Sequence, residues 1–541
     1  MTTTGREWWR GGVLYQIYPR SFADSNGDGI GDLPGILSKL DYVAKLGVDG
    51  IWISPFFKSP MKDMGYDVSD YCDVDPSFGS LRDFDALIAE ARAVGLRVMI
   101  DLVLSHTSIE HPWFVESRKD RSNAKSDWYV WVDPQDDGSP PNNWLSIFGG
   151  SAWQWDPRRR QYYMHNFLVE QPDLNFHDPD VRVALLNVAK FWLERGVDGF
   201  RLDTVNFYFH DQQLRSNPPA ALEFREAPDV PASNPYVFQN HLYDKTRPEN
   251  LGFLMDLRAL LDSYPEKTSV GEVGASERGL DVMGEYTAGG DKLHMCYAFD
   301  LLNDKFGARY IRQRMEVYEK IVTDGWGCWA FTNHDVARSI TRWGFEDVAD
   351  QAAPLLLAMQ LSLRGSPCIY QGEELGLSEA VLAYEDIQDP YGKTFWPDFK
   401  GRDGCRTPMP WDNSPGAGFT TGKPWLPIPD AQRARSVAEQ EANPASPLNR
   451  ARALLHWRRS VPALVRGEMK FHDAEEPVLA LSRTLEGKEV LCVFNLGRAA
   501  RSFHAKRFGK LTPIEGHGFG STLSGAQIDL PPFTAFFAAR G

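Results

Sequence analysis

Cysteine is scarce in this chain, and its spacing excludes a C-x-x-C metal or redox motif. The 541 residues contain six cysteines, scattered singly along the sequence. They are Cys72, Cys296, Cys328, Cys368, Cys405 and Cys492. Three of the six lie in apolar, strand-like runs, so we interpret them all as reduced core residues and predict a cytoplasmic protein. A chain of this length can bury a large core without a disulfide or metal to hold it.

Long apolar runs and an excess of positive charge are also missing. No uninterrupted apolar segment is long enough to span a bilayer, and residues 1–10 lack the apolar stretch of a secretion signal. The formal net charge of −15 argues against nucleic acid or an anionic membrane as a partner. A neutral or cationic small ligand fits this charge better.

What the sequence does contain is an alternation of apolar strands and amphipathic helices. Apolar runs at 13–18, 50–55 and 97–103 are separated by apolar residues at helical spacing over 36–46 and 84–91. Further strands are predicted at 199–204, 268–273, 294–299, 328–332 and 367–370. All-apolar strands alternating with helices are typical of a parallel sheet covered by helices. Eight of them predict an α/β fold, a closed (β/α)8 TIM barrel.

Two segments depart from this rhythm and predict additional domains. Residues 107–176 lose the helical period, and a structureless loop of that length is improbable, so we predict an inserted subdomain after the third strand. From 461 to 541 the apolar period becomes two, which predicts a C-terminal antiparallel β-sandwich. The barrel then comprises 1–106 and 177–460, with long loops at 210–250 and 375–422.

Oxygen-bearing side chains recur at every second position around glycines between residues 24 and 32. The spacing resembles the first nine positions of a calcium loop, but Gly35 stands where an EF-hand has its glutamate. The predicted ligands are Asp24, Asn26, Asp28, the carbonyl of Ile30, and Asp32. A solvated turn is the alternative. We favour a structural Ca²⁺ site, with Mg²⁺ as the other candidate ion, and predict no organic cofactor.

Charged side chains follow the predicted strands at the end where a barrel builds its active site. Arg201 and Asp203 stand two apart on one strand, so both point to the same side, and the guanidinium favours the ionised carboxylate. Other strand ends carry His106, Glu272, and Asn333-His334-Asp335. Carboxylates at one barrel mouth, with no H-E-x-x-H motif and no Cys or Ser nucleophile beside a base, are typical of glycoside cleavage.

These segments resemble the sequence regions of the α-amylase superfamily, glycoside hydrolase family 13. Residues 101–106, 199–203, 271–273 and 331–335 resemble its first four regions. Residues 171–175 resemble a fifth region in the form seen in oligo-1,6-glucosidases and α-glucosidases, not in α-amylases. The resemblance covers essentially the whole chain.

The resemblance implies a role for each matched residue. Asp203 would be the nucleophile that forms a β-glucosyl ester, Glu272 the general acid/base, and Asp335 the residue that holds the sugar hydroxyls. The residues that would orient the nucleophile or bond the glucose are Arg201, His106 and His334. A retaining mechanism follows, because carboxyl groups about 5–5.5 Å apart leave no room for a water in the first step.

The resemblance also implies a closed sugar pocket. Asp67 and Arg402 would clamp the non-reducing end, and Tyr66 would stack beneath the ring, which implies exo-action on short substrates. In this branch the residue after the nucleophile is Val in α-1,6-cleaving members and Thr or Ala in α-1,4-cleaving ones. Thr204 therefore favours α-1,4 bonds.

Together these features predict a retaining, exo-acting α-glucosidase that releases α-glucose from maltose-like substrates, with sucrose as a second candidate, and that also transfers glucose. One alternative is a dedicated transglucosylase or sucrose-cleaving enzyme of the same family. A catalytically dead carbohydrate-binding or transporter-associated relative is disfavoured, because the three carboxylates are present and a membrane helix is not. We expect a monomer or homodimer whose partner is a small oligosaccharide or disaccharide.

Overall fold

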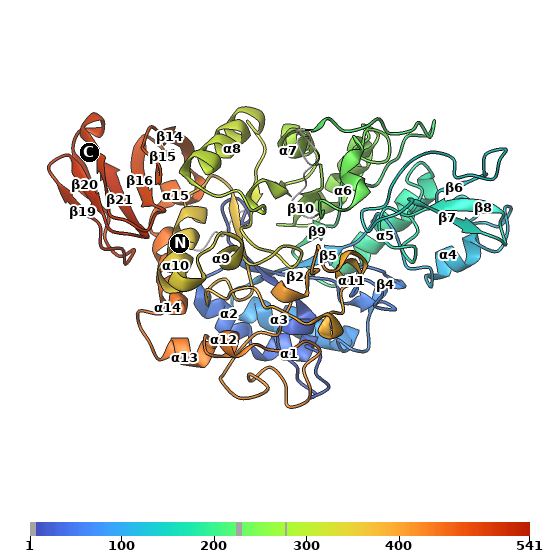
Figure 1. The fold of residues 1–541 in the computed structure, drawn as a ribbon, viewed down its shortest axis with the longest axis horizontal. Coiled ribbons are helices and arrows are strands. Elements are labelled where there is room, and N and C mark those ends of the chain that lie inside the picture. The colour runs from blue at the N-terminus through green and yellow to red at the C-terminus, as the bar shows by residue number, and fades with distance from the viewer. Residues whose placement is uncertain (1–6, 223–224, 226–229, 276–277) are drawn as a thin grey trace.

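The computed structural model describes residues 7–222, 225, 230–275 and 278–541. Residues 1–6 lie outside the described residues. They belong to the segment 1–10, for which we predicted no secretion signal. In Figure 1 the barrel occupies the middle of the molecule, with strands β6–β8 at one end and the C-terminal strands at the other. The three predicted parts therefore follow one another along the longest axis.

Eight parallel strands form the central sheet, in the order β11-β10-β9-β5-β2-β1-β13-β12. Their bounds are β1 Leu14–Ile17, β2 Gly50–Ile53, β5 Arg97–Leu102, β9 Gly199–Leu202, β10 Thr268–Val273, β11 Met295–Ala298, β12 Cys328–Trp329 and β13 Ser366–Tyr370. A parallel bridge between Cys296 and Gly327 joins the two outer strands. The sheet thus closes into a barrel, and the predicted fold class is confirmed.

Helices follow most of the barrel strands and cover the outside of the barrel. They are α1 Leu33–Ser38, α2 Leu40–Leu46, α3 Leu81–Ala93, α5 Pro179–Glu194, α6 Asn250–Asp262, α7 Gly279–Thr287, α8 Ala308–Ile321, α9 Ser339–Arg342 and α10 Ala349–Gln360. The single helix predicted up to Leu46 is wrong. Lys39, at φ −114° and ψ 5°, separates α1 from α2, because its backbone leaves the helical region.

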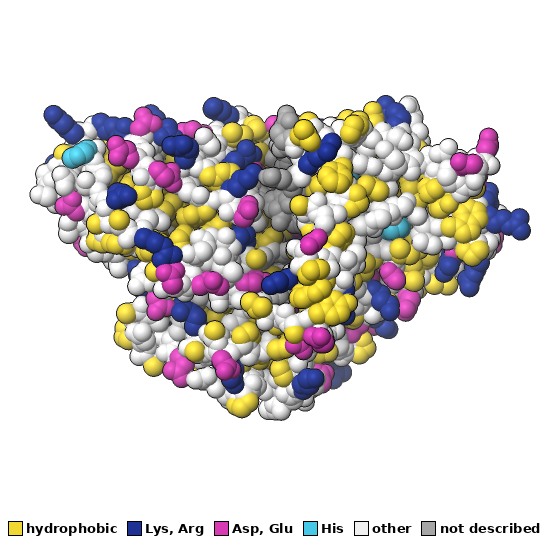
Figure 2. All heavy atoms as spheres, in the orientation of Figure 1, with side chains coloured by type: hydrophobic (Ala, Val, Ile, Leu, Met, Phe, Trp, Pro, Cys, Tyr) yellow, Lys and Arg dark blue, Asp and Glu magenta, His cyan; other side chains and the backbone are white. Residues whose placement is uncertain are grey.

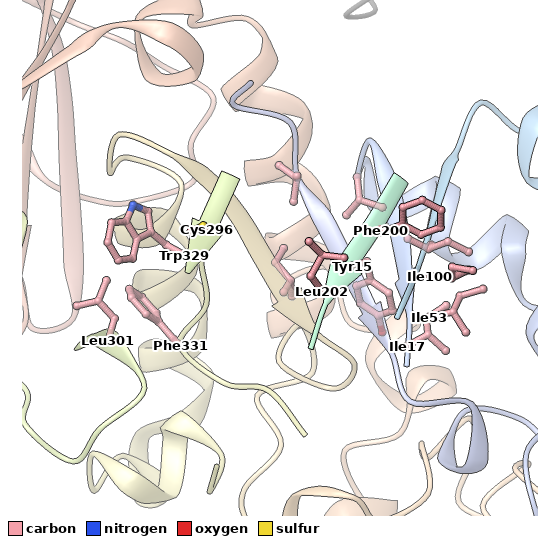
Figure 3. Close-up of a cluster of buried hydrophobic side chains, with 14 of the residues drawn as sticks. Tyr15, Ile17, Ile53, Ile100, Phe200, Leu202, Cys296, Leu301, Trp329 and Phe331 are labelled. Atoms are coloured by element: carbon pink, nitrogen blue, oxygen red, sulfur yellow. The ribbon is translucent and has the colours of Figure 1, made fainter. Parts of the chain in front are cut away.

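Alternation along the barrel strands sorts their side chains into an outer and an inner layer. Ile17, Ile53, Ile100 and Phe200 come from four adjacent strands and gather in the buried cluster of Figure 3. The intervening residues point inward, and a separate inner cluster holds Leu14, Trp52, Met99, Val270, Met295, Tyr297, Cys328 and Cys368. The same alternation turns polar residues at the strand ends toward the barrel axis.

The chain between β5 and α5 forms the inserted unit. It contains α4 Pro112–Ser117 and a three-stranded antiparallel sheet of β6 Trp131–Val132, β8 Gln161–Met164 and β7 Trp153–Asp156. A short hairpin, β3 Phe57–Lys58 with β4 Asp70–Val74, follows β2. An isolated bridge between His106 and Asp173 ties the insertion to the end of β5. The insertion therefore reaches the barrel mouth.

The C-terminal part is an antiparallel β unit, as predicted. The helices before it are α11 Pro390–Phe395, α12 Asp430–Arg433, α13 Val437–Glu441, α14 Pro447–Arg459 and α15 Pro462–Arg466. Its strands are β14 Glu468–His472, β15 Val478–Leu485, β16 Lys488–Asn495, β17 Arg501–His504, β18 Leu511–Pro513, β19 Thr522–Ser524, β20 Gln527–Leu530 and β21 Thr534–Arg540. A five-stranded and a three-stranded sheet share a buried apolar cluster, which includes Leu491 and Phe536 from one and Ile528 from the other.

The surface and the cysteines match the composition. Figure 2 shows basic and acidic side chains interspersed over the face in view, without an extended basic area. None of the described helices is long and apolar enough to cross a membrane. All six cysteines are free; Cys72 is half-buried and the other five are buried.

Candidate active site

One buried guanidinium holds three carboxylates at the mouth of the barrel. Arg201 Nη1 lies 2.8 Å from Asp101 Oδ1 and 2.6 Å from Asp203 Oδ1. Its Nη2 lies 2.7 Å from Glu272 Oε1. The side chain of Arg201 is completely buried. The structure therefore brings together Arg201, Asp203 and Glu272, and adds Asp101 to the group.

Strand register explains why these side chains meet. Asp101 on β5 is the neighbour of Arg201 on β9, and Glu272 on β10 is the neighbour of Tyr297 on β11. Side chains alternate in direction along a strand, and these residues all occupy positions that face the barrel axis. This placement brings three carboxyl groups around one guanidinium.

Thr204 joins the two carboxylates predicted to be catalytic. Its N–H donates to Glu272 Oε2 at 3.1 Å, and its hydroxyl donates to Asp203 Oδ2 at 3.2 Å. Its φ of 41° lies in the left-handed region, which is uncommon for a β-branched residue. Such strained residues concentrate at functional sites. Glu272 thus contacts the residue immediately after Asp203.

The shared guanidinium does not keep all three carboxylates ionised. Burial raises the pKa of Asp203 to about 7, with Arg201 acting in the opposite direction and Asp101 adding to the rise. Burial likewise raises the pKa of Glu272 to about 7 and that of Asp101 to about 6, again against Arg201. Arg201 therefore acts on the pKa of Asp203 in the expected direction, but burial opposes it. Close carboxylates around one cation titrate as a group that retains a proton near neutral pH.

Asp335 has the opposite environment. Burial opposes its ionisation, but His334, Arg402 and Arg406 lower its pKa below the usual range. Arg406 Nη2 lies 2.8 Å from Asp335 Oδ1, and Arg402 Nη1 lies 3.2 Å from the same oxygen. Burial lowers the pKa of His334 to about 3, so at neutral pH the two arginines supply the positive charge. Asp335 is therefore an anion at neutral pH.

The two predicted histidines are neutral and held by neighbours. His334 lies 2.5 Å from the Tyr66 hydroxyl through Nε2, and the two rings stack with centroids 5.5 Å apart. Burial lowers the pKa of His106 to about 4. Its Nε2 lies 3.0 Å from the Tyr66 carbonyl oxygen and 3.1 Å from Gln171 Nε2. Gln171 comes from the inserted unit, which therefore completes this wall.

A cavity of about 910 Å³ opens over these groups. Of the residues predicted to catalyse or bind substrate, Tyr66, His106, Asp203, Thr204, Glu272, Asp335 and Arg402 line it. Arg201 and His334, both fully buried, support the lining residues instead. The rest of the wall mixes aromatic side chains, such as Phe148, Phe167 and Phe207, with charged ones. The cavity thus offers both charged groups and aromatic faces to a ligand.

Of the two residues expected to clamp the sugar, Arg402 lines the cavity but Asp67 does not, and Asp63 is the aspartate of this turn that contacts Arg402. Arg402 Nη2 lies 3.0 Å from Asp63 Oδ1 and 2.7 Å from Asp389 Oδ1. Asp67 is fully buried and accepts hydrogen bonds from Ser59 Oγ and from the N–H groups of Lys62 and Asp63. It stabilises the turn, whereas Asp63 lines the cavity.

The family of α-amylase catalytic domains matches residues 16–467 of this chain. The chain belongs to the α-amylase family. It is a glycoside hydrolase of family 13.

Relatives in this family share nearly the whole length. A probable α-glucosidase of Rhizobium meliloti (strain 1021) is 59% identical over 538 residues, covering 98% of this chain and 97% of its own. An oligo-1,6-glucosidase of Heyndrickxia coagulans is 37% identical over 535 residues, with 92% and 93% covered. The crystal structure of XgtA, an α-glucosyl transfer enzyme, superimposes with a TM-score of 0.97 at 56% identity and covers 99% of both chains. The trehalulose synthase MutB of Pseudomonas mesoacidophila MX-45 superimposes with a TM-score of 0.89 at 32% identity, covering 98% and 99%.

The predicted ion loop of this family member is a turn built on its own side chains. Asp24 accepts hydrogen bonds from the N–H groups of Asn26, Gly27 and Gly29, and Asp32 accepts from the Gly35 N–H at the start of α1. No group of three or more His, Cys, Asp or Glu able to hold a metal ion occurs in the described part of the chain. The oxygen donors suit Ca²⁺ by their chemistry, and the site stays a prediction.

The assignment of Asp63, and not Asp67, as the partner of Arg402 can be tested directly. We expect Asp63→Asn to raise KM for an α-glucoside by about tenfold or more, because it removes the charge that fixes Arg402 at the cavity. Asp67→Asn is the matched control. It should lower Tm, because a buried acceptor of N–H groups is lost, while the folded enzyme keeps its KM. Steady-state kinetics and thermal unfolding measure both, and an equal rise of KM in the two variants would contradict the assignment.

Proposed function

We propose that this enzyme is a retaining, exo-acting α-glucosidase that uses Asp203 as nucleophile and Glu272 as acid/base. The contact of Glu272 Oε2 with the Thr204 N–H carries this proposal, because it places the acid/base beside the residue next to the nucleophile. Both carboxyl groups also bind the same guanidinium. Such proximity favours the retaining arrangement, in which the carboxyl groups are about 5–5.5 Å apart.

In the first step a carboxylate oxygen of Asp203 attacks C1 of the glucose. The bond from C1 to the glycosidic oxygen breaks, and the proton of Glu272 passes to that oxygen, so the aglycone leaves as a neutral alcohol. A β-glucosyl ester and an ionised Glu272 result. Asp335, an anion held by Arg402 and Arg406, would bind the 2- and 3-hydroxyls of the sugar.

In the second step water or the hydroxyl of another sugar attacks C1 from the opposite face. Glu272 removes its proton, the ester bond breaks, and Asp203 leaves as a carboxylate. Two inversions return the α configuration. The choice of acceptor divides the enzyme's turnover between hydrolysis and glucosyl transfer.

The shared proton supports these roles. Three carboxylates around Arg201 retain a proton near neutral pH, and Glu272, with a pKa raised by burial to about 7, suits an acid that works there. The negative charge of Asp203 raises the pKa of Glu272, so an ionised nucleophile favours a protonated acid/base. The two roles thus depend on one another.

We also propose that the cavity accepts the non-reducing end of short α-1,4-linked substrates. Arg402 contacts Asp63, Asp335 and Asp389, and this network supports a closed end beside the sugar. Thr204 supports the α-1,4 preference. Sucrose is the second candidate substrate, since its glucose is bound through the same α linkage.

A dedicated transglucosylase is the second candidate function, because the solved relative at 56% identity is named an α-glucosyl transfer enzyme. The ratio of free glucose to oligosaccharide products at high maltose concentration separates the two. Mostly free glucose supports the α-glucosidase, and mostly transfer products support the transferase.

Asp203→Asn and Glu272→Gln test the catalytic roles. We expect Asp203→Asn to lower kcat/KM by at least about 10⁴-fold, because the ester no longer forms. Glu272→Gln should slow maltose cleavage by about 10²–10⁴-fold and slow the first step with α-glucosyl fluoride far less, because fluoride leaves without a proton. The loss of rate above about pH 7, where Glu272 would be deprotonated, should disappear in this variant.

Glu374→Gln is a matched control for that experiment. Glu374 is a buried glutamate that accepts hydrogen bonds from the Tyr15 and Tyr42 hydroxyls and does not line the cavity. Its variant should keep the pH profile of the wild type. Equal losses for maltose and the fluoride in Glu272→Gln would refute the acid role.

Thr204→Val tests the linkage preference. We expect the ratio of kcat/KM for maltose to that for isomaltose to fall by about tenfold, which corresponds to about 1.4 kcal/mol of discrimination. Thr204→Ser retains the hydroxyl that contacts Asp203 and serves as the control. An unchanged ratio in Thr204→Val would show that the linkage preference arises elsewhere.

The ion loop is a separate proposal with its own test. We expect 1 mM CaCl₂ to raise Tm of the chelator-treated protein by about 2–4 °C, because an ion that binds the folded state stabilises it. Asp28→Ala should remove this response, whereas alanine at the exposed Asp137 should keep it. The same Tm with CaCl₂ and with chelator in the wild type would exclude the site.

A further inference from the structure

Tyr297 makes a contact with the acid/base that sequence reasoning did not identify. It lies on β11 in register with Glu272, and its hydroxyl donates to Glu272 Oε1 at 2.9 Å. The same hydroxyl accepts from Arg201 Nε at 3.2 Å and from Arg201 Nη2 at 2.9 Å. Tyr297 is 4% exposed and is not among the residues that line the cavity. It can therefore act on substrate only through its neighbours.

The tyrosine ring is held firmly in the inner layer of the barrel. It packs against Trp52 and Phe299, with ring centroids 6.4 Å and 6.3 Å away. The Arg201 guanidinium carbon lies 5.0 Å from the Trp52 ring centre and 5.9 Å from that of Tyr297. Burial raises the pKa of the Tyr297 hydroxyl well above its ordinary value, so it keeps its proton throughout the working pH range. A fixed, neutral donor thus faces one oxygen of Glu272.

The two oxygens of Glu272 have different surroundings. Oε1 lies 2.7 Å from Arg201 Nη2 and also accepts the Tyr297 hydrogen bond. Among contacts within the described part of the chain, Oε2 accepts the longer bond from the Thr204 N–H, at 3.1 Å. A donor and a cation stabilise negative charge on Oε1, so the proton of a neutral Glu272 belongs on Oε2.

We propose that Tyr297 is a positioning residue that places the transferable proton on Glu272 Oε2, beside the nucleophile, and favours the ionised acid/base. The inference rests on the proposed role of Glu272. With the proton on Oε2, the oxygen bonded to the residue after Asp203 delivers it to the glycosidic oxygen. In the second step the same oxygen removes the proton of the acceptor, and Oε1 keeps the bonds that stabilise the carboxylate.

Other charged groups near this pair act in both directions. Arg201 lowers the pKa of Glu272, and Asp203 and Asp335 raise it. The charged groups with the largest effect on the pKa of Tyr297 are Arg201, Glu272 and Asp101. Since these groups remain in place, removal of the Tyr297 hydroxyl should raise the pKa of Glu272, because a hydrogen bond to the charged form is lost.

Tyr297→Phe tests the proposal, because phenylalanine retains the ring in its apolar surroundings. We expect the alkaline limb of kcat/KM for maltose to move upward by about one pH unit. We also expect kcat to fall about tenfold, because the ionised form of Glu272, which acts as the base in the second step, is no longer stabilised by the tyrosine. If Tyr297→Phe is unstable, Tyr297→Met serves in its place. It removes the hydroxyl and the ring together and should move the alkaline limb of kcat/KM in the same way.

Tyr42→Phe is the matched control. It removes a buried tyrosine hydroxyl that donates to Glu374 at 2.7 Å and should leave the pH profile unchanged. An unmoved alkaline limb in folded Tyr297→Phe, while Glu272→Gln loses that limb, would overturn this inference alone. If Glu272→Gln itself kept the limb, the proposed role of Glu272 would fail first.

Discussion

The active site depends on a charge imbalance: one buried guanidinium faces three carboxylates. Arg201 contacts Asp101, Asp203 and Glu272 within 2.8 Å. Burial of so many acids is unfavourable unless they are paired or protonated, and a single cation cannot pair them all. The group therefore retains a proton near neutral pH, which is the condition that acid-assisted cleavage of a glycosidic bond requires. Asp335 has its own cations, Arg402 and Arg406, which stabilise its negative charge.

The barrel supplies that imbalance through its strand register. Residues in the inward phase at the carboxyl ends of β5, β9, β10 and β11 are neighbours across the sheet, and alternation aims all of them at the axis. The outward phase is apolar and packs beneath the helices, so the polar residues at the strand ends are supported by a large hydrophobic outer core. The inserted unit adds Gln171, which contacts His106 and Asp63 in the wall of the cavity. The strand register thus brings the charged groups together, and the inserted unit helps to enclose the cavity.

Much of this arrangement could be predicted from the sequence. The apolar strands, their number and the helices between them follow from periodicity, which depends on short-range geometry. The strand-end residues Arg201, Asp203 and Glu272 were likewise predictable, because alternation and chain order suffice to bring them to one face. The break at Lys39 was not, since the apolar spacing continues through it. The partners Tyr297, Arg406 and Asp389 come from distant segments, and their spacing along the chain carries no sign of their contacts.

The sequence by itself determined the family, the barrel and the identity of the strand-end carboxylates, because these depend on local periodicity and on residues within single short segments. Only the tertiary structure decided which loop aspartate meets Arg402. The turn before Tyr66 contains positive φ values at Met61, Met64 and Gly65, so neither helical nor strand periodicity describes it. Asp63 and Asp67 are equivalent candidates by composition. Their roles separate because this turn directs one carboxylate into the cavity and folds around the other.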